Sequence, residues 1–235
     1  MDINTDPYSS YIGSQVKSLK KRLRHEKRRA NPFVTISRQT GAYGLTVSKD
    51  LCEYLQKNER RATCVWTVFD KELIQKVIQV YDLPETVLPY LSEDTVSEIQ
   101  DTIEEILGLH PPHDTLVFKT NETILHLAQL GYCIMVGRGS NIITAKMPGG
   151  VSIRLVSPME RRLEHVEEYY GMTRKKAQEF ISTEDRHRRN YVKKYFNKDI
   201  EDPLLYDMVI NVGSLDRSET IQVIGDLVLN RFPGP

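Results

Sequence analysis

A short segment with the residue types of a phosphate-binding loop, Ser37 to Thr46, follows the apolar run 33–36. A standard phosphate loop, G-x-x-x-x-G-K-[ST], binds phosphates through backbone N–H groups at a helix N-terminus and through its lysine. Alignment of Gly44 with the second glycine puts Leu45 at the lysine position and Thr46 at the hydroxyl position. The match is partial, so the segment is either a phosphate loop without lysine or a plain turn between a strand and a helix.

An acid and two arginines follow other apolar runs, at positions where they could bind a nucleotide. Asp70 ends the run 64–70 and could accept hydrogen bonds from a ribose or a base amino group, or cap the next helix. Arg138 stands between two glycines after the run 132–136, and its planar guanidinium suits a phosphate or a base unless it pairs with an acid. Arg162 lies near the start of a predicted helix, where a cation opposes the helix dipole and so indicates an outside anion.

The chain alternates short apolar runs with amphipathic helical patterns, which predicts an α/β protein with a parallel sheet. Ligands of such sheets bind beyond the carboxyl ends of the strands, so the residues that follow each strand are the candidates for a site. The expected strands cover 33–37, 64–70, 132–136, 151–156 and 206–212, and the expected helices cover 46–57, 71–81, 115–130, 158–170, 173–196 and 218–231.

Several of these segments together resemble the cytidylate kinase-like family. Residues 37–46 resemble its loop pattern, near S-R-x-x-G-x-G-G-R, with Tyr43 in place of a glycine and Leu45 in place of an arginine. The resemblance covers about residues 31–228. The later matches are Asp70-Lys71-Glu72-Leu73-Ile74, Val136-Gly137-Arg138-Gly139, Pro158-Met159-Glu160-Arg161-Arg162, the segment 185–195 and the segment 197–216.

The resemblance implies an adenylate-kinase-type P-loop fold, with three α/β/α layers around a five-stranded parallel sheet. Residues 31–235 would form this domain, with a helical acceptor-binding lobe at 82–130 and a lid at 172–200. Residues 1–30 would precede the domain as a basic arm and helix.

The activity that the resemblance implies is transfer of a phosphoryl group from ATP, with Mg²⁺, to CMP, dCMP or a similar nucleotide. Such transfer depends mainly on positioning and on neutralising the charge spread over oxygens, which suits arginines. The Mg²⁺ ligands are not indicated. The implied donor-phosphate residues are Ser37, Arg38, Gly41, Gly44 and Thr46; Asp70 and Arg138 would bind the acceptor; Arg162, Arg188 and Arg189 would stabilise the transferred charge.

Tyr43 and Leu45 leave a second function open, that of a catalytically weak protein which binds nucleotide as a sensor or partner subunit. Glycine lets a backbone approach phosphate closely, and a tyrosine restricts that approach. Leu45 removes a cation that the family pattern carries. Kinase and sensor differ in whether a nucleotide reacts at the loop or only binds there.

The charges balance overall but are unevenly distributed. The chain has 32 Lys+Arg and 32 Asp+Glu, which indicates no polyanionic partner. Segment 17–29 holds eight Lys and Arg against one acid, and segment 77–118 holds no Lys or Arg. These segments are either two solvated helix faces or surfaces that pair within one molecule or between protomers of a homo-oligomer. Nucleic-acid binding is a distant third function, because the basic segment has no aromatic residue to stack on bases.

The remaining features predict a cytoplasmic globular protein. No apolar run approaches the roughly 18 residues that a membrane span needs, and the polar N-terminus lacks the apolar region of a signal peptide. Three cysteines in apolar patterns predict reduced, mostly buried thiols rather than a disulfide framework. Metal-ligand spacing of histidines, a G-x-S-x-G motif and a G-x-G-x-x-G motif are all absent from the sequence, which argues against a zinc site, a serine hydrolase and a nicotinamide site.

Overall fold

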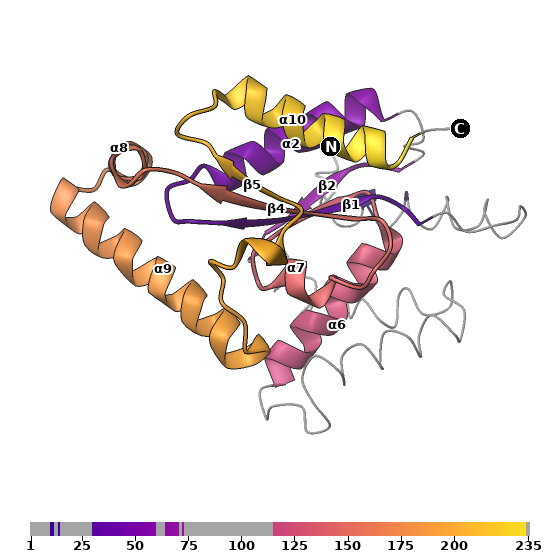
Figure 1. Ribbon diagram of the computed structural model, residues 1–235, viewed down its shortest axis with the longest axis horizontal. Coiled ribbons are helices and arrows are strands. Elements are labelled where there is room, and N and C mark those ends of the chain that lie inside the picture. Colours follow the sequence, from indigo (N-terminus) through magenta and orange to yellow (C-terminus); the bar gives the residue numbers. More distant parts are fainter. Residues whose placement is uncertain are drawn as a thin grey trace, which may run out of the picture.

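The computed structural model describes residues 10–11, 14, 30–59, 64–70, 72 and 115–233. Its centre is a sheet of five parallel strands in the order β2-β3-β1-β4-β5 (Figure 1). The central strand β1 pairs with β3 on one side and with β4 on the other. The carboxyl ends of these three strands therefore lie together. The strands are β1 (Phe33–Arg38), β2 (Thr67–Phe69), β3 (Cys133–Val136), β4 (Gly150–Val156) and β5 (Met208–Asn211).

Helices cover both faces of the sheet. The helices α2 (Gly44–Asn58) and α10 (Arg217–Arg231) cover one face, and α6 (Thr115–Leu130) and α7 (Ser140–Ile143) cover the other (Figure 1). Alternate strand residues point to opposite faces, so Val34 packs in the core under α2 and α10, whereas Phe33 packs in the core under α6 and α7. The three-layer α/β fold with a five-stranded parallel sheet, which the sequence predicts, is confirmed.

The connection from β4 to β5 is long and mostly helical. It contains α8 (Met159–Tyr170), α9 (Arg174–Phe196) and the short 3-10 helix η3 (Pro203–Leu205). Gly171, with a φ of 63°, ends α8 and separates it from α9. The two helices share a small apolar cluster of their own, and the last residue of α9, Phe196, packs in the core under α6.

The second strand is shorter than the sequence predicts. Cys64 and Trp66 are buried in the core, as the apolar pattern indicates. The Trp66 N–H, however, donates to the Gln56 side chain at 2.7 Å, and pairing with β3 starts at Thr67. The short helix α7 is not foreseen in the sequence. The expected helix 71–81, the lobe residues 82–114 and the basic arm 1–30 lie outside the described residues, except for residues 10–11, 14, 30 and 72.

Two further expectations concern the cysteines and membranes. The three cysteines form no disulfide among the described residues, and Cys64 and Cys133 are buried while Cys52 is half-buried, which agrees with the prediction that they are mostly buried. Among the described helices, none has the length and apolar character needed to cross a membrane.

Candidate active site

The segment 37–46 connects β1 to α2 as a tight loop that needs both of its glycines. Gly41 has a φ of 82°, and a Cβ there would lie 2.6 Å from the Arg162 carbonyl oxygen. A Cβ on Gly44 would lie 2.7 Å from Cγ of Arg38. Because both contacts are far inside van der Waals distance, the loop backbone can lie this close to Arg38 and Arg162 only with glycine at these positions.

The loop leads into a helix N-terminus without a side-chain cap. Tyr43 is the N-cap residue of α2, its side chain accepts no hydrogen bond from the first turn, and that turn contains no acidic residue. The N–H groups of a first helical turn have no partner within the helix and attract anions. Tyr43 has a φ of 53°, so its backbone takes the left-handed conformation that favours glycine.

Three arginines from different elements line a cavity of about 240 Å³ beside the loop: Arg38 from β1, Arg138 from the β3–α7 turn and Arg188 from α9. Burial, and then the charge of Arg188, lowers the pKa of Arg38 from 12.5 to about 10. Burial also lowers the pKa of Arg188. Within the described ranges Arg38 forms no ion pair, although Asp70 and Glu184 partly offset its charge. A cavity in which buried cations repel one another favours an anionic ligand.

The backbone that carries Arg138 is strained. Gly137, Arg138 and Gly139 are three consecutive left-handed residues, with φ values of 83°, 59° and 70°. A Cβ on Gly137 would lie 2.2 Å from Nη1 of Arg38, so the turn packs directly against that guanidinium. A left-handed conformation costs an L-residue such as arginine roughly 1–2 kcal/mol. Strain of this kind at a cavity is typical of functional sites.

Arg162 lies apart from the arginine cavity in an internal network. Its side chain is buried, its Nε donates to the Thr40 carbonyl oxygen at 2.7 Å, and its Nη2 pairs with Asp185 of α9. Asp185 Oδ1 also accepts from the Thr40 N–H at 2.8 Å and from the Thr40 hydroxyl at 2.7 Å. Arg188 Nη1 donates to the Thr40 hydroxyl at 2.5 Å. The family resemblance implies that Arg162 stabilises the transferred charge, whereas its contacts in this structure hold the loop to α9.

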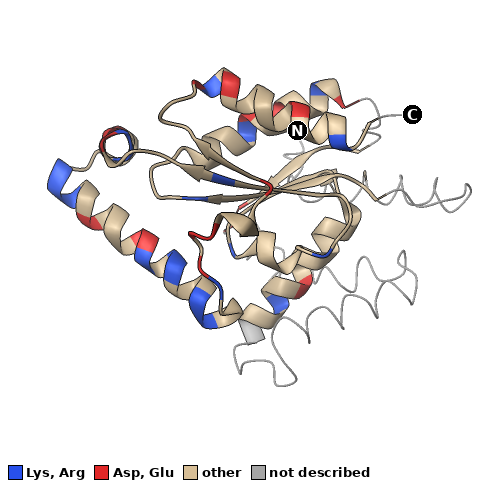
Figure 2. Ribbon diagram, in the orientation of Figure 1, with Lys and Arg blue, Asp and Glu red and all other residues tan. Residues whose placement is uncertain are grey.

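The other sequence-predicted residues lie at different distances from the arginine cavity. Ser37 lines it. Asp70 follows β2, and its charge acts on Arg38. Arg189 is exposed on α9 and is not among the residues that line the cavity. Figure 2 shows that lysines and arginines recur along α9, so the basic pattern of this segment includes both cavity-facing and solvated residues.

A second cavity, of about 730 Å³, borders the α2 end of the loop. The Tyr43 and His165 rings are stacked there, with centroids 3.8 Å apart, and His165 Nδ1 lies 3.1 Å from the Gly41 carbonyl oxygen. The Tyr43 ring thus packs on α8. Thr46 lines the same cavity, together with residues 212, 213 and 215 that follow β5. The loop 37–46 therefore borders one cavity at each of its ends.

A buried arginine that sequence reasoning missed, Arg154, binds the first residue of the loop segment 37–46. Arg154 of β4 is buried, and it donates to Ser37 Oγ at 3.0 Å and to Glu201 at 2.7 Å. The Tyr206 hydroxyl lies 3.3 Å from Ser37 Oγ and donates to the Ile200 carbonyl oxygen at 2.8 Å. The only sequence signal for this arrangement is a charged residue in the middle of an apolar strand.

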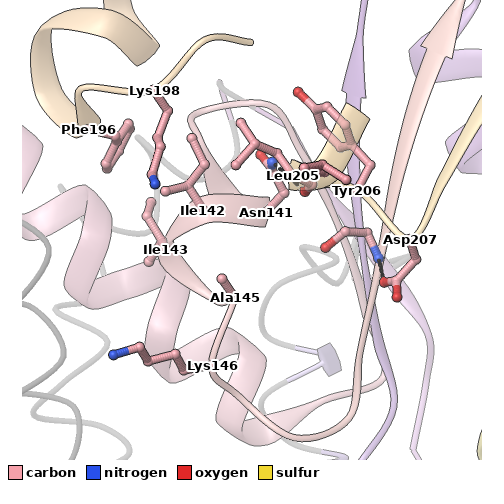
Figure 3. Close-up of a pocket in the computed structure, with 12 residues that line it drawn as sticks. Asn141, Ile142, Ile143, Ala145, Lys146, Phe196, Lys198, Leu205, Tyr206 and Asp207 are labelled. Carbon is pink, nitrogen blue, oxygen red and sulfur yellow. Dashed lines mark hydrogen bonds between the residues drawn. The ribbon is translucent and has the colours of Figure 1, made fainter. Parts of the chain in front are cut away.

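A third pocket, of about 570 Å³, lies between α7 and η3 (Figure 3). Asn141 lines both this pocket and the arginine cavity, and its Nδ2 donates to the Leu205 carbonyl oxygen at 3.2 Å. Lys146 and Lys198 lie beside its apolar wall, whereas Asp207 accepts a hydrogen bond from Ser152 N at 2.7 Å (Figure 3). Asp202 caps η3 by accepting from Leu204 N. Asp202 and Asp207 thus shape the segment that leads into β5.

Mg²⁺ fits the site only through a small number of protein ligands. The described residues contain no group of three acidic, histidine or cysteine side chains that could hold a metal ion. Mg²⁺ in kinases usually keeps several waters and binds substrate phosphates with one or two protein ligands. Thr46, half-buried in the first turn of α2 beside the second cavity, offers one such oxygen.

The fold and the site together define a class of protein. A glycine-containing loop follows the central strand of a 2-3-1-4-5 parallel sheet, and arginines converge beside it. This is the architecture of a P-loop kinase-like protein. A family model described as the cytidylate kinase-like family matches residues 33–214. The chain belongs to this family.

Several solved structures are similar to this chain, and the first of them agrees with the fold. A crystal structure of an uncharacterized protein from Eubacterium ventriosum ATCC 27560 has a TM-score of 0.57 and 17% identity, and the match covers 84% of this chain and 98% of that one. A shikimate kinase from Bacteroides thetaiotaomicron has a TM-score of 0.45 and 10% identity over 84% and 98% of the chains. Another, from Acinetobacter baumannii in complex with shikimate, has a TM-score of 0.43 and 15% identity over 87% and 96%.

One curated relative matches only part of the chain. The uronate isomerase of Corynebacterium glutamicum is 24% identical over 100 residues, which make up 43% of this chain and 19% of the isomerase. The match therefore spans only about a fifth of that enzyme's length.

Proposed function

We propose that this protein is a nucleoside monophosphate kinase that transfers the γ-phosphoryl group of ATP to CMP or dCMP. The observation that carries the proposal is the group of three arginines, Arg38, Arg138 and Arg188, around one cavity at the β1 end of a loop whose other end leads into an uncapped helix N-terminus. Two of them have a lowered pKa. Such a site is destabilised while it is empty of anions and becomes favourable when phosphate oxygens enter it.

The donor would bind at the α2 end of the loop. The stacked Tyr43 and His165 rings would offer an aromatic surface to a base, and the N–H groups of the first turn of α2 would bind the phosphates. When bound, Mg²⁺ would neutralise part of the phosphate charge, and the Thr46 hydroxyl is the group that would hold it. Tyr43 supports this arrangement because its backbone already has the conformation of a glycine and its ring packs on His165.

The acceptor would place its phosphate among the arginines. Arg138 would bind that phosphate, and Asp70, at the end of β2, would accept hydrogen bonds from the ribose or the base amino group. Arg38, which ends β1 at the loop, and Arg188, which donates to the Thr40 hydroxyl, would neutralise the oxygens of the transferring group. Electrostatic stabilisation by groups held in place is the largest catalytic contribution available to such a site.

A panel of acceptors tests the proposal. Incubation with ATP and Mg²⁺ and, separately, with CMP, dCMP, UMP or AMP should yield a diphosphate with the cytidine nucleotides, measured by chromatography. Arg138→Ala should lower kcat/KM for CMP roughly tenfold to a hundredfold, because a charge-assisted hydrogen bond contributes about 1.5–3 kcal/mol. An unchanged rate in this variant would remove Arg138 from the acceptor site.

Arg138→Gly is the matched control for folding. It removes the same guanidinium and also relieves the left-handed strain. It should therefore lose as much activity as Arg138→Ala, while its free energy of unfolding should be about 1 kcal/mol higher than that of Arg138→Ala. Diphosphate formation in none of the reactions, together with thermal stabilisation by ATP, would favour the second function, a nucleotide-binding sensor. The observation behind that alternative is Leu45 at the position of a family cation.

A further inference from the structure

Asp185 of α9 is the one carboxylate that binds the loop backbone within the described part of the chain. It accepts hydrogen bonds from both the N–H and the hydroxyl of Thr40, and it pairs with the buried Arg162. Arg188 Nη1 lies 3.5 Å from the same carboxylate. A backbone N–H, a hydroxyl and two guanidinium groups thus converge on one anionic group.

These donors are the kinds of group that bind a phosphate. Backbone N–H groups of a loop before a helix, hydroxyl groups and arginine forks are all typical phosphate ligands. Thr40 lies within the loop 37–46, and Arg188 lines the arginine cavity. In the free protein the carboxylate of Asp185 therefore fills an anion site at the loop.

We infer that Asp185 is an internal substitute for a phosphate group and that an incoming nucleotide phosphate competes with it for Thr40 and Arg188. This inference rests on the proposed function, because it describes how the same loop is regulated. Entry of a phosphate weakens the bonds between Thr40 and Asp185, and α9 is then held to the loop through the phosphate instead of through its own carboxylate. Breaking the contacts of Asp185 costs free energy, and this cost reduces the net free energy gained when the phosphate binds. Asp185 therefore lowers the affinity for the nucleotide.

An ordinary structural ion pair makes the opposite prediction. If Asp185 only fixes the loop and Arg162, its removal disorders the anion site and weakens phosphate binding. If it occupies the anion site, its removal leaves the donors of Thr40, Arg162 and Arg188 unfilled, and phosphate binding becomes tighter although the free protein is less stable. Stability and affinity then change in opposite directions.

The test measures pyrophosphate binding by titration calorimetry for the wild type and for Asp185→Asn. The expected result is a Kd about tenfold lower in the variant, together with a lower Tm without ligand and a larger pyrophosphate-induced rise in Tm. Asp185→Ser, with a smaller neutral side chain, replaces the asparagine variant if that variant does not fold. An equal or higher Kd, or pyrophosphate binding by neither protein, would overturn the inference.

Glu184→Gln is the matched control. Glu184 is the preceding acid on α9, lies 3.8 Å from Arg188 and also lines the arginine cavity, but within the described part of the chain it makes no hydrogen bond to Thr40. Removal of its charge should change the Kd less than threefold; a gain equal to that of Asp185→Asn would mean that general electrostatics, not competition at Thr40, sets the affinity. Pyrophosphate binding needs no phosphoryl transfer, so failure of the kinase assay and failure of this inference are separate results.

Discussion

Arg38→Met should raise the free energy of unfolding of the free protein by about 1–2 kcal/mol and abolish its stabilisation by ATP. The folded-state pKa of Arg38 is about 10, below the ordinary 12.5, so its positive charge destabilises the folded state at neutral pH. At about 1.4 kcal/mol per pKa unit, the shift from 12.5 to about 10 corresponds to at most roughly 3.5 kcal/mol, and relaxation and water penetration around the charge reduce this to the expected 1–2 kcal/mol. Methionine keeps the apolar stem that packs on Gly44 while removing the charge. Ligand at about 100 times its Kd stabilises a protein by roughly 2.7 kcal/mol, and this gain requires Arg38.

Denaturant unfolding with and without ATP and Mg²⁺ measures both effects. For the sign, a basic group with a lowered pKa costs stability at every pH below its folded-state value, and the cost fades as pH rises from about 10 toward 12.5. The gain in the free energy of unfolding caused by Arg38→Met should therefore be constant between pH 6 and pH 8. Lys176→Met, which removes one exposed positive charge from α9, should leave both quantities nearly unchanged. A destabilised Arg38→Met protein that still responds to ATP would contradict the role given to this arginine.

Arg162→Met should have the largest effect on stability, a loss of about 3 kcal/mol in the free energy of unfolding. Arg162 is 5% exposed, and it is bonded to both the Thr40 carbonyl oxygen and Asp185. Removing one partner of a buried ion pair leaves the other charge uncompensated, which typically costs about 3–5 kcal/mol; the partial exposure of Asp185 puts the expectation at the lower end. Thermal unfolding should show a decrease in Tm of roughly 6–12 °C.

Arg161→Met is the matched control for that measurement. Arg161 is the neighbouring residue on α8, and its ion pair with Glu164 at 3.3 Å is exposed on both sides. Surface pairs of this kind contribute about 0–1 kcal/mol, so the variant should unfold within about 1 kcal/mol of the wild type. Equal destabilisation by the two substitutions would mean that the network of Arg162, Thr40 and Asp185 does not hold the loop to α9.

The layers of the fold and the convergence of the cavity arginines are predictable from the sequence. Buried parallel strands are near-continuous apolar runs, and the carboxyl ends of such strands meet at one edge. Arg38 and Arg138 follow or end two of these runs, which is sufficient to predict that they approach each other. The extent of β2 is not predictable in this way, because the bond from the Trp66 N–H to the Gln56 side chain is a tertiary contact.

The pairing of Arg162 with Asp185, and of Arg154 with Glu201, could not be read from the sequence. Both pairs join residues of different elements, 23 and 47 positions apart, and α9 carries several acids at comparable spacing from Arg162. Which acid meets which arginine depends on how α8 and α9 pack on the loop. A buried arginine therefore indicates that a polar contact exists, whereas its partner is known only from the structure.

The central claim is that a phosphate loop without lysine binds a nucleoside triphosphate through arginines and an uncapped helix N-terminus. Titration calorimetry of the wild-type protein with ATP and Mg²⁺ tests it most directly. The prediction is one site per chain with a Kd below about 1 mM, which corresponds to about −4 kcal/mol, and an affinity that falls as salt rises and is lost in Arg38→Met. No binding heat at millimolar ATP, or an affinity that is the same in Arg38→Met, would contradict the claim.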